Sequence, residues 1–122
     1  MKHVTRALAV LICTAALSAH HSPVMFDMAK TQTLEGAVVE FAWTNPHSSI
    51  QLDVATASGV ERWGVEMGSP NSMVKAGWKS NIIKAGDKVS VAVHPLKSGE
   101  HGGIFMSITL PDGRRLGGRA AE

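Results

Sequence analysis

Short segments in which apolar and polar residues alternate are the feature that most restricts the fold of this chain. Residues 49–54, 60–67, 88–93 and 104–110 all show this alternation. A period of two places successive side chains on opposite faces of a strand, so each segment predicts a half-buried β-strand. The apolar sets on single faces are Ile50/Leu52/Val54, Trp63/Val65/Met67, Val89/Val91/Val93 and Ile104/Met106/Ile108/Leu110.

A longer segment precedes these four and a helix-forming segment interrupts them. Residues 33–43 read as a long strand, in which Gly36 allows a bend or a bulge. Ser69 then offers an N-cap, Pro70 suits the first turn of a helix, and Gly77 is a typical stop. The sequence therefore predicts three strands, one short helix and two further strands.

This order predicts an all-β fold, a small five-stranded OB-like Greek-key barrel with one short helix between strands 3 and 4. A small β-sandwich is the alternative, because periodicity does not reveal which strands are neighbours. The expected barrel domain is 33–116, preceded by an N-terminal arm, 20–32, and followed by a flexible tail, 117–122. "PDGRR" at 111–115 is expected to form a turn.

The first nineteen residues have the pattern of a secretory signal peptide. Lys2 and Arg6 give a positive start, an apolar run follows over 7–17, and Ala19 is a small residue at the expected cut. The run is too short for a membrane-spanning helix, which needs about 20 residues. We therefore expect a periplasmic or secreted protein with no membrane insertion once the signal peptide, 1–19, is removed.

Charge and cysteine content exclude several classes of protein. Lys2 and Arg6 are two of the 12 basic residues, so residues 20–122 carry ten basic and ten acidic residues. A neutral exported chain lacks the positive field that nucleic-acid binding requires, and no nucleic-acid partner is expected. The single cysteine, Cys13, lies in the signal peptide, so neither disulfides nor thiolate ligands are expected in the mature chain.

Histidines gather where an OB barrel binds its ligands. The loops between strands 1 and 2 and between strands 4 and 5 border one binding region in this fold. His47 lies in the first of these loops, and His94 and His101 flank the second. His20 and His21 lie in the arm, directly after the expected cleavage point.

These histidines predict a transition-metal site, with copper as the expected ion. If cleavage follows Ala19, His20 supplies both its amine and its ring, and His21 or His47 adds a third nitrogen, an arrangement that Cu(II) favours. If Ala19 is instead the first residue, the amine, two amides and the His21 ring can chelate the ion. His94 and His101 are second-choice ligands. The opposing interpretation is that His20 and His21 are only polar residues of the arm, and that His47 and His94 hold their turns through backbone hydrogen bonds.

A metal-free module that binds a periplasmic protein or a small ligand is the competing hypothesis. It would use the barrel face and the Trp43 loop, with Asn45, Trp63 and Glu66 as further contacts. Catalysis is not expected, because the chain has neither a recognisable nucleophile motif nor a glycine-rich phosphate loop. The pH dependence of binding separates the two hypotheses, since only histidine ligation weakens as imidazole protonates.

Several motifs together resemble one protein family. They are "AHHS", "FAWTNPH", "RWGVEMGSPNSMVKAGW", "KAGDKVSVAVHPLKSG" and "LPDGRRL". The chain is similar to a family of small exported bacterial proteins of unknown function across nearly the whole mature sequence. The family pattern falls on His20, His21, Asn45, Pro46, His47, Trp63, Glu66, Gly77 and Trp78. This resemblance implies export and a shared compact β domain, and it implies no activity.

Overall fold

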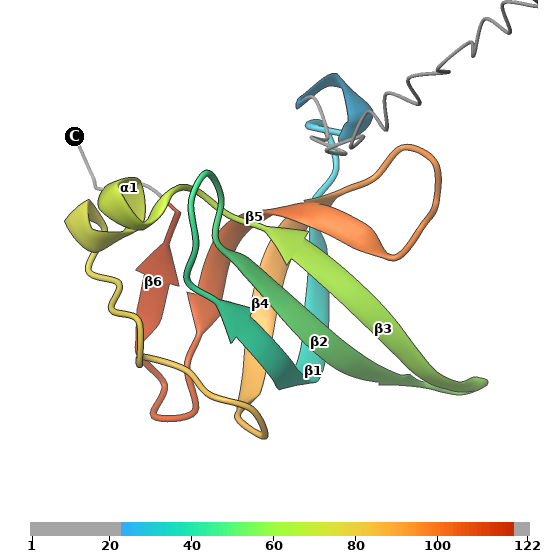
Figure 1. Cartoon of the computed structure of the whole chain (residues 1–122). Coiled ribbons are helices and arrows are strands. Elements are labelled where there is room, and N and C mark those ends of the chain that lie inside the picture. Colours follow the sequence, from blue (N-terminus) through green and yellow to red (C-terminus); the bar gives the residue numbers. More distant parts are fainter. Residues whose placement is uncertain (1–22, 119–122) are drawn as a thin grey trace, which may run out of the picture.

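The computed structural model describes residues 23–118. Within them the chain forms a short 3-10 helix, six β-strands and one α-helix (Figure 1). The elements are η1 (Pro23–Met25), β1 (Gln32–Ala42), β2 (Ser49–Thr56), β3 (Gly59–Glu66), α1 (Pro70–Lys75), β4 (Lys88–Pro95), β5 (Gly102–Thr109) and β6 (Arg115–Gly117). The predicted signal peptide, His20 and His21 lie outside the described residues.

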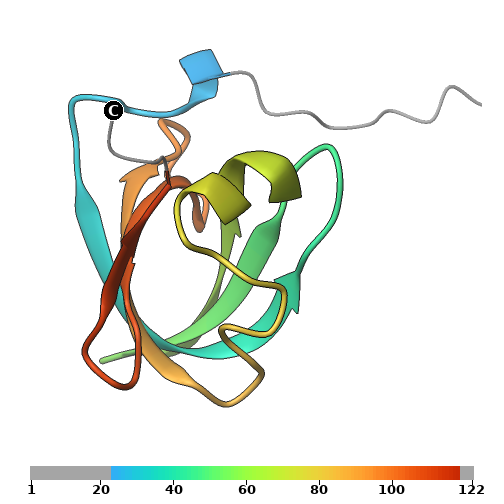
Figure 2. The ribbon, with the colours of Figure 1, turned by 90° about the vertical axis from the view of Figure 1, so that its left-hand side faces the viewer.

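Five of the strands close into a barrel. The strand order is β3-β2-β1-β4-β5-β6, and a parallel pairing of β3 with β5 joins the two sides. Figure 2 looks into the resulting ring of strands. The all-β prediction of a five-stranded barrel with a short helix between strands 3 and 4 is confirmed, and the sandwich alternative is wrong.

A sixth strand was not expected from the sequence. β6 pairs with β5, matching Ile108 with Leu116. Leu116 packs against the hydrophobic core, and the indole N–H of Trp78 donates a hydrogen bond to the Gly117 carbonyl at 2.9 Å. Contacts with distant residues therefore order a short segment whose own sequence carries no strand pattern.

Bulges correct two details of the predicted strand pattern. In β5, Ala92 pairs with Ser107 and Val93 with Phe105, so Met106 is an extra residue. Phe105 is consequently buried, while Ile104 and Met106 are only half-buried, contrary to the expectation of one shared apolar face. In β1 the irregularity lies between Val38 and Glu40 rather than at Gly36.

The helix begins as predicted and contributes to the core. The Ser69 side chain accepts a hydrogen bond from the Ser72 backbone N–H, and Pro70 occupies the first turn. Met73 is fully buried, and Trp78, just after the helix, is 1% exposed. Among the described residues, no helix has the length and apolar character needed to cross a membrane.

Asp87 makes a testable contribution to acid stability. Hydrogen bonds from the Lys84 backbone N–H and ammonium hold the pKa of this carboxyl below its ordinary 3.8. Its stabilising effect is therefore complete above the ordinary pKa and is lost as pH falls through the lower folded-state pKa. We expect the stability difference between wild type and Asp87→Asn to shrink between about pH 4 and pH 2, measured by urea unfolding.

The exposed strand residue Glu40 supplies the control for this experiment. Glu40→Gln removes one carboxylate from β1 without touching the turn before β4. A difference between wild type and Asp87→Asn that stays constant across the acid range would contradict the assigned role of the Lys84 contacts.

Candidate functional site

A trough lies at one end of the barrel, where three segments meet. In both ribbon views the β1–β2 loop, η1 and the β4–β5 loop lie at the same end (Figures 1 and 2). The trough encloses about 450 Å³ between the β2–β3–β5 surface and the β4–β5 loop. Its lining combines Phe26, Val65 and Leu96 with the polar residues Ser49, Gln51, Glu66, Glu100 and His101, and with Gly64, Gly102 and Gly103.

Phe26, which follows η1, contributes to one wall of this trough. Phe26 makes an isolated antiparallel bridge with Leu96 and is only 3% exposed. The Asp27 N–H donates to the Pro95 carbonyl at 2.8 Å, and the Lys97 N–H donates to the Met25 carbonyl at 2.9 Å. These bonds fix the N-terminal segment beside the β4–β5 loop.

The Asn-Pro-His turn places His47 beside a trough carboxylate. The Asn45–Pro46 peptide is cis, and the Thr44 hydroxyl donates to the His47 carbonyl at 3.2 Å. The Nε2 atom of His47 lies 3.9 Å from Oε1 of Glu66, whose residue ends β3. The His47 side chain is 48% exposed and that of Glu66 24% exposed, so both are accessible to a ligand.

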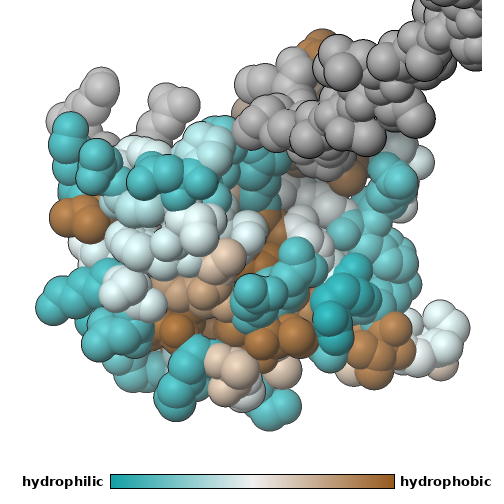
Figure 3. Space-filling model, viewed as in Figure 1, coloured by the Kyte–Doolittle hydropathy of each residue, from teal (hydrophilic) through white to brown (hydrophobic). Residues whose placement is uncertain are grey.

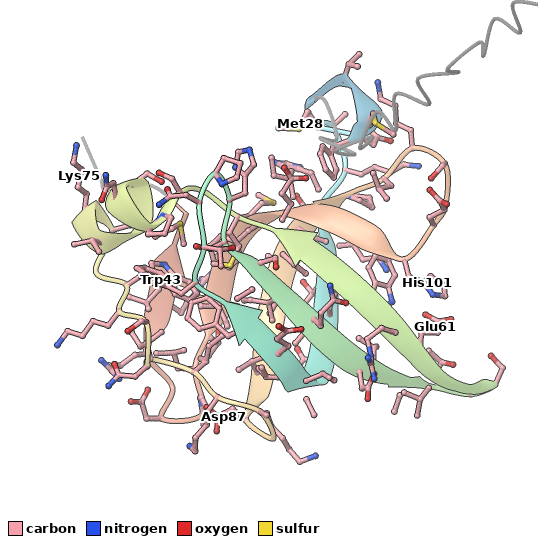
Figure 4. All side chains as sticks on the ribbon, viewed as in Figure 1. Met28, Trp43, Glu61, Lys75, Asp87 and His101 are labelled. Atoms are coloured by element: carbon pink, nitrogen blue, oxygen red, sulfur yellow. The ribbon has the colours of Figure 1, made fainter. Side chains whose placement is uncertain are left out.

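His101 belongs to a second cluster at the edge of the same trough. Its ring stacks on Trp63 with 5.2 Å between centroids, and its Nε2 lies 3.5 Å from Oε2 of Glu61. The Trp63 indole N–H donates to the same oxygen at 3.2 Å. Figure 4 shows Glu61 and His101 close together at the β3 side of the barrel.

The described residues provide pairs of potential ligands and no complete metal site. Within residues 23–118, no group of three or more His, Cys, Asp or Glu side chains is placed to hold a metal ion. The two pairs are His47 with Glu66 and His101 with Glu61. The predicted three-histidine site therefore depends on His20 and His21, which lie outside the described residues.

A family model described as a family of unknown function, DUF6152, matches residues 8–106. This chain is a member of DUF6152. The match covers β1 to β4, most of β5 and both histidine-bearing loops. Comparisons with curated proteins and with solved structures gave no match.

Other predicted site residues of this DUF6152 member lie away from the trough. His94 places Nδ1 2.7 Å from the Lys30 carbonyl, a contact that ties β4 to the segment before β1. Trp43 is half-buried and packs edge-on against Phe41 at 5.6 Å. Figure 4 places Trp43 well apart from His101, so the Trp43 side chain lies away from the trough although His47, in the same loop, lies beside Glu66.

Trp63 also differs from an open stacking platform. It is 6% exposed and belongs to the hydrophobic core, while His101 covers its ring. Asn45 is exposed in the turn that carries His47. Of the proposed contacts, only Glu66 lines the trough directly.

Two polar residues around the site were not anticipated from the sequence. Glu61 and Trp63 are two residues apart in β3, so their side chains lie on the same face of the strand. This spacing could have identified Glu61 from the sequence. Ser48 is fully buried, and its hydroxyl has no hydrogen-bond partner within the described part of the chain. Its backbone is bonded to Met67 and Gly68, so β2 and the end of β3 are held together just behind His47.

Proposed function

We propose that this protein is an exported metal-binding protein that holds copper through His47 and the histidines of its mature N-terminus. The observation that carries the proposal is the 3.9 Å approach of His47 Nε2 to Glu66 Oε1 at an accessible edge of the barrel. An imidazole and a carboxylate are two of the ligand types that divalent copper accepts. The role is binding or delivery rather than turnover.

Chain length supports the participation of the N-terminal pair. His21 precedes Phe26 by five residues, which span at most about 18 Å when fully extended. Phe26 lines the same trough as Glu66. With His20 first in the mature chain, an amine and two imidazoles join His47 and favour the nitrogen-rich, tetragonal coordination of Cu(II).

The remaining histidines take secondary roles in this proposal. His101 contacts Glu61 through Nε2 and stacks on Trp63, so Nδ1 is the ring nitrogen that it would offer to a metal. His94 is committed through one ring nitrogen to the Lys30 carbonyl. Both remain second-choice ligands. Export follows from the pattern of the first nineteen residues, with a periplasmic or secreted location.

A Cu(II) titration of the natively processed protein tests the proposal. The N-terminus is confirmed by intact mass, and binding is measured by isothermal calorimetry. We expect one ion per chain, with affinity reduced by at least about 100-fold in His47→Ala and in the His20→Ala/His21→Ala double variant, because each loses direct ligands. His94→Ala tests a second-choice ligand and should retain the affinity within about threefold, since His47 and the N-terminal pair are the proposed first-choice ligands.

The pH dependence of the same titration provides a second test. Metal binding requires neutral imidazole, and free imidazole protonates at about pH 6.5. Copper affinity is therefore expected to fall as pH decreases through this range. Absence of stoichiometric binding, or binding unaffected by His47→Ala, would reject the copper site. The metal-free interaction module that uses the barrel face and the Trp43 loop would then be the better hypothesis.

A further inference from the structure

The trough also has the lining of a site for an organic ligand, and this ligand would bind without copper. We propose that it binds a small organic cation, an aliphatic amine whose ammonium group pairs with Glu66 and Glu100 and whose alkyl stem lies along the apolar wall. The cavity of about 450 Å³ has the size of a small-molecule site. The charges and the apolar surface of the cavity lining indicate which class of ligand fits.

Charge selects a cation over an anion. Glu66 and Glu100 both line the trough, and no Lys or Arg is among its described lining residues. The third ionisable lining residue, His101, is held by Glu61 and by the face of Trp63. An ammonium group gains charge-assisted hydrogen bonds here, whereas a carboxylate or phosphate would meet two negative charges.

The apolar lining selects an alkyl stem over a sugar. Leu96 supplies half-buried aliphatic surface, and Phe26 is the only Phe, Tyr or Trp among the described lining residues. Phe26 is 3% exposed, so its ring offers no open face for stacking a sugar. Gly64 adds no side chain to the floor, and a Cβ there would approach nothing closer than the Gln51 amide at 3.5 Å. A slender chain can therefore lie against the backbone.

The second large concavity lacks this charge bias. It encloses about 620 Å³ at the opposite end of the barrel, and its lining includes Lys88 together with Glu35 and Asp53. Asp53 is paired with Arg62, and Glu35 accepts a hydrogen bond from Ser90 at 2.6 Å. Figure 3 shows apolar side chains gathered low on the front face, over β1 and β2. The carboxylates of this concavity share it with Lys88, whereas no Lys or Arg is among the described lining residues of the trough, so the trough is the better cation site.

Three five-carbon probes of different charge test this inference on chelator-treated protein. They are cadaverine with two ammonium groups, 1,5-pentanediol with none, and glutarate with two carboxylates. Binding is followed by NMR through the backbone amide signals of Gly64, Gly102 and Gly103. We expect saturable shifts with cadaverine alone, and an affinity at least about tenfold lower in the Glu66→Gln/Glu100→Gln double variant, which keeps the shape of the trough.

Glu40→Gln is the matched control, because it removes an exposed carboxylate from β1 outside the trough. It should bind cadaverine as the wild type does. Equal binding of pentanediol, preferred binding of glutarate, or shifts confined to the opposite concavity would overturn the inference. No metal is present in this assay, so its failure would leave the copper proposal intact, and the failure of the copper titration would leave this inference intact.

Discussion

Replacing Trp78 with alanine is expected to lower the free energy of unfolding by about 3 to 5 kcal/mol. The side chain is 1% exposed and touches the rings of Phe41 and Phe105 at centroid distances of 5.8 and 5.4 Å. Its removal leaves a cavity that these neighbours cannot fill. It also leaves the Gly117 carbonyl without its indole donor and so weakens β6. Urea unfolding followed by circular dichroism measures the loss.

Two further variants separate the causes of this destabilisation. Trp78→Phe keeps much of the buried ring and removes the hydrogen bond to Gly117, so it should cost about 1 to 3 kcal/mol. Trp43→Ala removes an indole that is only half-buried and should cost less than Trp78→Ala. If Trp43→Ala proved the more damaging change, Trp78 would not be the central packing residue that the structure indicates.

Replacing Gly103 with alanine is expected to cost about 1 to 3 kcal/mol, although alanine adds only one carbon. The new Cβ would lie 2.8 Å from both Cβ and Cγ2 of Val93 and 2.9 Å from the His94 carbonyl. Neither a β-carbon nor a backbone oxygen can move without moving β4. Gly103 also pairs with Val65 in the β3–β5 contact that closes the barrel. Thermal and urea unfolding both report the loss.

Gly102 supplies a matched comparison in the adjacent position. A Cβ there would come within 2.6 Å of Cδ1 of Leu96, which is the end of a rotatable side chain. Leu96 can turn aside, so Gly102→Ala should cost less than about 1 kcal/mol. Equal costs at the two positions would show that β4 adjusts more easily than the contact distances imply.

Much of this fold could be predicted from local patterns in the sequence. Alternation over residues 49–54 and 60–67 marked β2 and β3, because a strand exposes successive side chains on opposite faces. Ser69 and Pro70 marked the start of α1, since capping depends on neighbouring residues only. The order of these elements favoured a five-stranded barrel over a β-sandwich, and the strand pairing decided between them.

The site could be predicted only in part. Placing His47 and His101 on two loops at one end required only the strand order. The partners of these histidines, Glu66 and Glu61, depend on how β3 lies against the β1–β2 loop and the β4–β5 loop. Such distances depend on packing between segments far apart in the chain. The participation of His20 and His21 stays a prediction.

The sequence by itself determined the strand-forming segments, the helix start and the loops that carry histidine, because these depend on contacts within a few residues. Tertiary structure decided the rest. The Met106 bulge turns Phe105 into the core because the strand must curve to close the barrel, and β6 forms because Trp78 and the core hold it. Closure also creates the trough, since only the pairing of β3 with β5 brings Glu66 and His101 to one surface.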